Sequence, residues 1–97
     1  MKKILSVFVL CVGLVMSLSA NAQYIVDTTS CSYTVNLPAS PTTGTVVVIT
    51  DGGSWGSNNL TVGRNGNTIE GQADNLLLDL TGSLVYIVYD GTTWQVV

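Results

Sequence analysis

The stretch LVYIVYDGTTWQVV, Leu84 to Val97, decides the fold class. Its first six residues are β-branched, aromatic or leucine, which is the composition of a strand. Asp90-Gly91 follows, and this pair favours a two-residue type I′ turn because both central positions of that turn need positive φ. Such a turn would place Ile87 opposite Trp94. The stretch therefore predicts an antiparallel hairpin.

Other segments carry strand and turn signals of the same kind. TVVVIT, Thr45 to Thr50, is almost purely β-branched, which predicts a strand buried on both faces or inside an oligomer. LLLDL, Leu76 to Leu80, is short and bounded by glycines, so we predict a strand there despite the helix propensity of leucine. PASPTTG, Pro38 to Gly44, predicts a turn.

A second hairpin is predicted within LTVGRNGNTIEG, Leu60 to Gly71. Asn65-Gly66 suits a two-residue type I′ turn, which would place the apolar Val62 opposite Ile69. Arg64 lies beside the turn. It is either a solvated charge or the donor of a contact with a carboxylate of another chain in an oligomer.

These segments together predict an all-β chain of short antiparallel strands and tight hairpins. No lysine lies beyond the first three residues, although natural monomeric sheets commonly guard their edges with lysine, proline or bulges. We therefore expect a homo-oligomer. The alternative is a small monomeric sandwich or barrel whose edges close on themselves.

The N-terminus has the features of a secretory signal peptide. MKK is basic, residues 4–18 are apolar, and Ala20 and Ala22 provide small residues for cleavage after Ala22. The alternatives are a membrane anchor, for which the run is short, or a lipoprotein at Cys11. The prediction divides the chain into a signal peptide at 1–22, a lead-in segment at 23–36 and a β-rich module at 37–97. It places the product outside the cell, in the periplasm or in the envelope.

Cleavage would leave 75 residues with one arginine against six acids, a net charge of −5. Such a chain cannot neutralise several phosphates, so nucleic acid is excluded as a partner. It is equally unsuited to anionic membranes, and we expect no stable membrane insertion after cleavage. Cys31 would be the single cysteine of the product, either an inert buried thiol or half of an intermolecular bridge.

The sequence offers little for catalysis or metal binding. It has no histidine, and its acids lie next to turns, where aspartate is expected for backbone reasons. We predict no catalytic, cofactor-binding or metal-binding residue; a carboxylate pair for glycan hydrolysis, from residues such as Asp51 and Glu70, is a distant alternative. In DGGSWGSNN, residues 51–59, the residues Trp55, Asn58 and Asn59 could form a recognition loop, or Trp55 could plug the core.

Residues 37–97 resemble a β-rich module of bacteriophage tail fibres and related virion proteins. The resemblance rests on LPASP at 37–41, NNLTVGRNGNTIEG at 58–71, DNLLLDL at 74–80 and VYDGTTWQVV at 88–97. It implies a homotrimeric, non-enzymatic segment that is structural or engages a cell-surface glycan or protein receptor. The expected function is surface attachment or assembly, with association with a virion as the alternative location. An exported bacterial envelope or extracellular protein unrelated to virions is the alternative.

Overall fold

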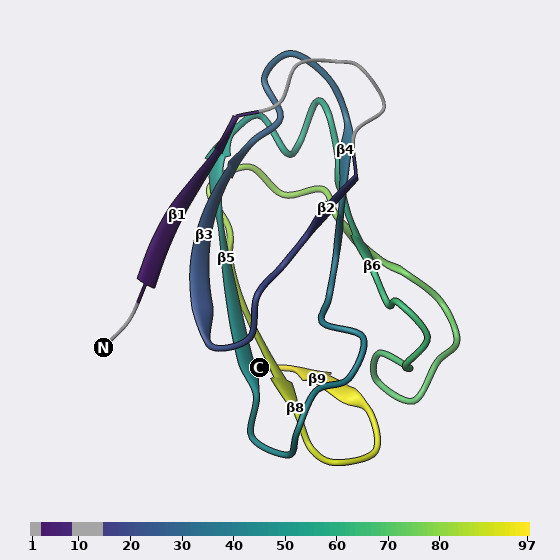
Figure 1. Cartoon of the computed structure of the whole chain (residues 1–97). Coiled ribbons are helices and arrows are strands. Elements are labelled where there is room, and N and C mark those ends of the chain that lie inside the picture. Colours follow the sequence, from purple (N-terminus) through teal and green to yellow (C-terminus); the bar gives the residue numbers. More distant parts are fainter. Residues whose placement is uncertain (1–2, 9–14) are drawn as a thin grey trace.

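The computed structural model describes residues 3–8 and 15–97, with side chains from residue 17 onward (Figure 1). The described residues form strands and no helix, so the predicted all-β class is confirmed. The strands are β1 (Lys3–Phe8), β2 (Val15–Ser17), β3 (Ala22–Asp27), β4 (Tyr33–Asn36), β5 (Val46–Gly53), β6 (Leu60–Gly63), β7 (Leu76–Leu78), β8 (Leu84–Tyr89) and β9 (Trp94–Val96).

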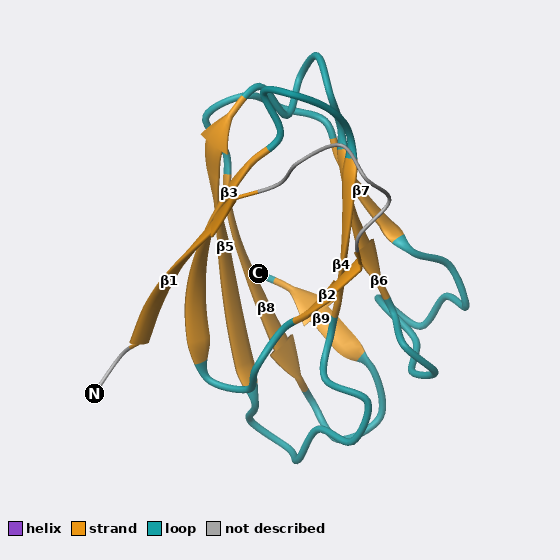
Figure 2. Ribbon diagram, turned by 45° about the horizontal axis from the view of Figure 1, so that its top comes forward, coloured by secondary structure: helices purple, strands orange, loops and turns teal. Residues whose placement is uncertain are grey.

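The strands make two sheets that face each other across one core (Figure 2). The five-stranded sheet has the order β1-β3-β5-β8-β9, and the four-stranded sheet has the order β2-β4-β6-β7. From β1 to β6 the chain alternates between the two sheets, and within each sheet these strands are parallel. The first six strands are thus three turns of a flattened winding, each turn giving one strand to each sheet.

Antiparallel strands close one end of this winding. Beyond β6 lies β7, beyond β5 lies β8, and β9 pairs with β8. The predicted strands at 45–50, 76–80 and 84–89 correspond to β5, β7 and β8 and are confirmed. The expected antiparallel pairing holds for β7, β8 and β9, whereas β1 to β6 pair in parallel, so both sheets are mixed. The crossover that parallel strands require is here a strand of the opposite sheet, as β4 is between β3 and β5.

The core forms where inward side chains of both sheets meet. Val47 and Ile49 of β5 are fully buried, and Val48 between them, on the outer face, is only 4% exposed. Val48 is thus buried on both sides of the sheet, whereas Val46 and Thr50, the other outward residues of this run, are half-buried, so burial on both faces holds for part of the strand. β5 also extends into the predicted loop, to Gly53. There a bulge faces Val26, and Gly52 lets the backbones approach, because a Cβ on it would lie 2.8 Å from Ile25 Cγ2.

The register predicted for LTVGRNGNTIEG is wrong, although its turn is right. Asn65 and Gly66 have φ of 50° and 91°, and Asn67 N donates to Arg64 O at 3.2 Å. Beyond the turn, however, Val62 pairs with Leu76 of β7 and not with Ile69. Ile69 instead bridges to Trp94, which leaves the isoleucine 4% exposed. Burial against the far end of the chain thus outweighs pairing within a local hairpin.

The C-terminal hairpin is also confirmed with a different register. Ile87 pairs with Val96 and Tyr89 with Trp94, so the loop spans residues 90–93 and is not a two-residue turn. The cause is the side chain of Asp90, whose Oδ1 accepts from Thr92 N at 2.8 Å and Thr93 N at 2.9 Å. A slip of two residues on one strand leaves every side chain on its predicted face.

The segments predicted as signal peptide and lead-in both contribute strands. The predicted leader supplies β1 and β2, and its residues 9–14, which include Cys11, lie outside the described residues. The lead-in contains β3 and β4, with Tyr24, Val26 and Val35 in the core. The lead-in is therefore part of the sandwich. Removal of the leader during export stays a prediction.

Matched isoleucine truncations test this core. Ile49→Val removes a methyl group from a fully buried site, so the free energy of unfolding should fall by about 0.5–1.5 kcal/mol. Ile25→Val makes the same change on the neighbouring strand, where the side chain is 41% exposed. This variant should change the free energy of unfolding by less than about 0.5 kcal/mol. Urea denaturation measures both. Equal losses at the two positions would contradict the assignment of inner and outer faces.

Candidate functional site

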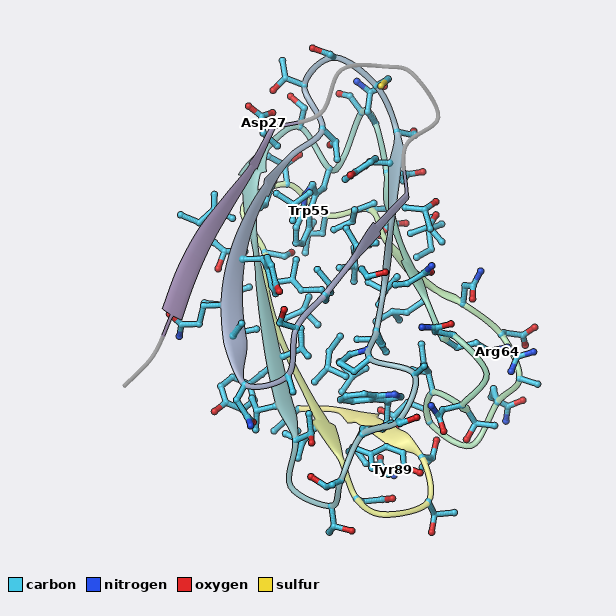
Figure 3. The ribbon with its side chains drawn as sticks, in the orientation of Figure 1. Asp27, Trp55, Arg64 and Tyr89 are labelled. Carbon is cyan, nitrogen blue, oxygen red and sulfur yellow. The ribbon has the colours of Figure 1, made fainter. Side chains whose placement is uncertain are left out.

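Trp55, the first of the three residues predicted to form a recognition loop, lies in the core between the two sheets (Figure 3). Its ring is fully buried, and its Nε1 donates a hydrogen bond of 3.0 Å to the carbonyl of Val26. Of the two roles predicted for Trp55, the structure shows that of a core plug. In this conformation the indole has no exposed face with which to bind a sugar or a partner.

Asn58 and Asn59 hold the same loop in place through their side-chain amides. Asn58 Nδ2 donates to the carbonyls of Thr28 at 2.9 Å and Thr29 at 3.1 Å, and Asn59 Nδ2 donates to Trp55 O at 2.8 Å. These bonds satisfy backbone carbonyls of the β3–β4 connection and of the loop itself. Trp55, Asn58 and Asn59 are therefore brought together, but their hydrogen bonds serve to hold the loop in place.

The carboxylates at this end of the sandwich also accept hydrogen bonds from backbone N–H groups. Asp51 accepts from Gly53 N through Oδ1 and from Gly82 N through Oδ2, both at 2.7 Å. Asp27 accepts from the side chain and the backbone N–H of Thr29, and these bonds lower the pKa of Asp27. No group of three or more His, Cys, Asp or Glu that could hold a metal occurs among the described residues.

Arg64 and Glu70, which flank the Asn65-Gly66 turn, do not meet. Arg64 Nη1 donates to Asn67 O at 3.2 Å, and Figure 3 shows Arg64 at the margin of the molecule. Glu70 Oε1 accepts from Val96 N at 3.2 Å. Glu70 and Asp51 bind different elements and share no hydrogen-bond partner, which gives no support to a glycosidase pair. The contact of Arg64 with another chain stays a prediction.

The predicted turn residues tie distant segments together. Asn65 Nδ2 donates to Leu37 O at 3.0 Å, so the turn is held against the start of the 37–45 connection. Asp90 caps its own loop, and its Oδ2 also accepts from Gln95 Nε2 at 2.9 Å. Bonds from Thr93 N, Gln95 and Thr92 N together lower the pKa of Asp90. Gly91 has φ of 102°, which favours glycine.

Cys31 is half-buried in the connection between β3 and β4 and packs against the core. It is disulfide-bonded, and its partner lies outside the described residues. The two alternatives given for the cleaved product, an inert buried thiol or an intermolecular bridge, stay predictions.

The outer face of the five-stranded sheet is the most unusual surface of the described chain. Outward positions on β3, β5 and β8 are mainly apolar, and three of them are well exposed: Ile25 at 41%, Leu84 at 62% and Tyr86 at 37%. Val97 joins this group, since its N donates to Tyr86 O at 2.8 Å and its side chain is 80% exposed. The alternation of outward residues in LVYIVY was the available signal, but it could not show that no layer covers them.

Comparison with known proteins provides no relative. No protein-family profile matches the chain, and no curated sequence matches it. Among the described residues there is also no helix with the length and apolarity needed to cross a membrane.

Paired tryptophan substitutions test the hydrogen bond that holds Trp55 in the core. Trp55 and Trp94 are both fully buried, but Trp94 Nε1 has no hydrogen-bond partner among the described residues. Trp55→Phe removes a donor to the carbonyl of Val26, whereas Trp94→Phe removes an unsatisfied donor. We expect the free energy of unfolding to fall by about 1–2 kcal/mol more for Trp55→Phe. Urea denaturation checks this, and an equal or greater loss for Trp94→Phe would refute it.

The pH dependence of stability tests the Asp90 cap. Because the pKa of Asp90 is lower in the folded chain than its ordinary value of 3.8, the carboxylate stabilises the fold above that value. This contribution is lost as the pH falls through the folded pKa. The difference in melting temperature between wild type and Asp90→Ala should therefore be largest near neutral pH and shrink below about pH 4.

Asp74→Ala is the matched control, since Asp74 is exposed and accepts no hydrogen bond from the described residues. Thermal melts monitored by circular dichroism measure all three proteins. If the two variants differ from wild type by the same amount at every pH, Asp90 does not act as a cap.

Proposed function

We propose that this chain is a non-enzymatic structural and binding module that associates with copies of itself outside the cell, in surface attachment or assembly. The observation that carries the proposal is the apolar outer face of the five-stranded sheet. Its exposed residues are Ile25, Leu84, Tyr86 and Val97. Contiguous exposed apolar surface of this kind marks a site of protein association in a soluble protein.

Charge favours a second copy as the occupant of this face. Within Val46–Thr50 and Leu84–Val88 no outward residue is charged, although the exported product would carry −5. Identical molecules with that charge repel one another, so the β5 and β8 part of this face, which carries no charge, is where they meet at the least cost, with Asp27 of β3 at its margin. An apolar face is also complementary to itself, as a two-fold contact requires.

The chemistry of the loops supports a role without catalysis. Asp51, Asp90 and Glu70 each accept backbone hydrogen bonds, and Asn58 and Asn59 donate to carbonyls. These side chains fix the positions of loops. The resemblance to tail-fibre modules adds the expectation of a trimer and of a glycan or protein receptor at a cell surface.

An exported envelope or extracellular protein unrelated to virions is the second candidate, and the apolar face serves it equally well. The leader motif favours this candidate, because virion fibres assemble in the cytoplasm. The genomic neighbourhood separates the two. Tail or lysis genes beside the coding sequence would support the virion function, and their absence from the neighbourhood would support the envelope function.

A charge placed on the apolar face tests self-association. Leu84→Lys should reduce an oligomer of the exported product to a smaller species, because the lysine would be desolvated in the contact. Leu77→Lys is the control: it adds the same charge at a residue that is 55% exposed on the four-stranded sheet. Light scattering gives the masses, and circular dichroism confirms folding. A wild-type monomer at micromolar concentration, or equal effects of the two variants, would overturn the proposal.

A further inference from the structure

The predicted leader forms the whole first turn of the winding. Its strands β1 and β2 are the outermost strands of the two sheets, where β1 pairs with β3 over six positions and β2 with β4 over three. In proteins built from stacked repeats, the terminal repeat covers the backbone and the apolar side chains of the next one. The first turn therefore occupies the position of a cap.

Cleavage after Ala22 would remove this cap completely. The bond from Leu18 N to Asn36 O, at 2.8 Å, and the one from Asn21 N to Val46 O, at 2.7 Å, would go with it. Leu18 is 4% exposed, so a buried apolar side chain would leave the core as well. The hydroxyl oxygen of Tyr24 would lose the hydrogen bond that it accepts from the backbone N–H of Ser19.

The uncovered edges would carry one guarding charge, Asp27 at the end of β3, and none elsewhere. Gln23–Val26 on β3 and Tyr33–Asn36 on β4 contain no charged residue, no proline and no glycine. β3 and β4 are joined by only five residues, 28–32, so the two open edges lie at the same end of the sandwich. Two rows of unpaired N–H and C=O groups at one end are a template for strand addition.

We propose that removal of the leader turns this end into a docking site for a second copy of the chain, with β3 and β4 of one copy pairing with the same strands of the other. The inference rests on the proposed export of the chain and on cleavage after Ala22. A second copy fits because it presents two open edges at the same separation as those it meets. A single strand from another protein would cover only one sheet.

The arrangement of the opposite end limits this association to two copies. There the sheets end in β9 and β7, which have three residues each, and the antiparallel strands leave no equivalent pair of long edges. Each chain thus has one open end, and pairing of like ends by a two-fold axis uses both. The contact closes and does not propagate into a fibre.

The burial of the cleavage position sets the order of events. Ala22 is 4% exposed and begins a strand held between β1 and β5 in the full chain. A peptidase needs the bond in an extended, accessible segment, so cleavage precedes closure of the sandwich. Pairing of two copies then replaces pairing with the leader as the chain folds.

The test compares the exported product with the uncleaved chain. The full gene is expressed in an exporting bacterial host, and mass spectrometry establishes that the product begins at Gln23. The uncleaved chain of 97 residues is made by cell-free translation without peptidase. Both are measured at micromolar concentration under reducing conditions, so that Cys31 does not determine the mass. Both carry Leu84→Lys, so that association through the apolar face does not contribute to the mass. In light scattering, we expect the product to have twice its chain mass and the uncleaved chain to be a monomer.

A matched pair of lysine variants locates the contact. Thr34 on β4 pairs with Thr61 on β6, so both face outward on the same sheet, but only Thr34 lies on the strand that cleavage exposes. Thr34→Lys in the exported product should weaken the dimer at least about tenfold, whereas Thr61→Lys should leave it intact. Neither residue lies on the five-stranded sheet, so failure of this contact is distinguishable from failure of the apolar face.

Amide exchange on the unmodified product keeps the test independent of how the variants fold. The amides of residues 23–27 and 33–36 should exchange more slowly in the dimer than after dilution to monomer. A monomeric product, an equally dimeric uncleaved chain, a dimer insensitive to Thr34→Lys, or unprotected edge amides would each overturn the proposal. Pairing with a strand of another protein would appear as a heteromeric mass and would overturn it too.

Discussion

The pairing of β5 on both sides, one neighbour parallel and the other antiparallel, is the constraint on which this fold depends. β3 lies parallel on one side of it and β8 antiparallel on the other. The strand therefore joins the wound N-terminal part to the folded-back C-terminal part. Its residues Val47, Val48 and Ile49 are all buried, although Val48 points away from the core. A buried strand of β-branched residues tolerates few alternative registers, because a slip of one residue exchanges its two faces.

Long-range packing explains why local hairpin signals were only partly realised. In an antiparallel meander, each turn decides which strand pairs with which. In this chain, β6 and β7 are neighbours in one sheet, but the 12 residues 64–75 join them, so the Asn65-Gly66 turn does not set their register. Asn65-Gly66 adopts the positive φ values that its sequence favours, yet Val62 takes Leu76 as its partner. The conformation of the turn is determined by Asn65 and Gly66 themselves. The strand register is determined by which apolar side chains can pack together in the core.

Much of the secondary structure, but little of the topology, could be predicted from the sequence. The β-branched run at 45–50 and the alternation at 84–89 are properties of single segments, and both are strands in the structure. Parallel pairing leaves no such local signature, since β3 and β5 are separated by the 18 residues 28–45. The candidate site shows the same division. A Gly/Ser/Asn loop with one tryptophan is compatible with recognition or with a plug. The choice depends on the carbonyl of Val26, which is 29 residues away.

The two surfaces proposed for association have different symmetry. Pairing of open edges extends both sheets in their own planes, with strands about 4.8 Å apart, whereas packing of outer faces stacks one sheet on another at about 10 Å. The directions are perpendicular, so one contact does not block the other. Edge pairing between like ends closes at two copies and cannot by itself produce a trimer. A three-fold assembly of this chain would therefore need a second surface, and the apolar face of Ile25, Leu84 and Tyr86 is the one we propose. A trimer held by that face would leave three open ends, and pairing of those ends would join trimers into larger assemblies.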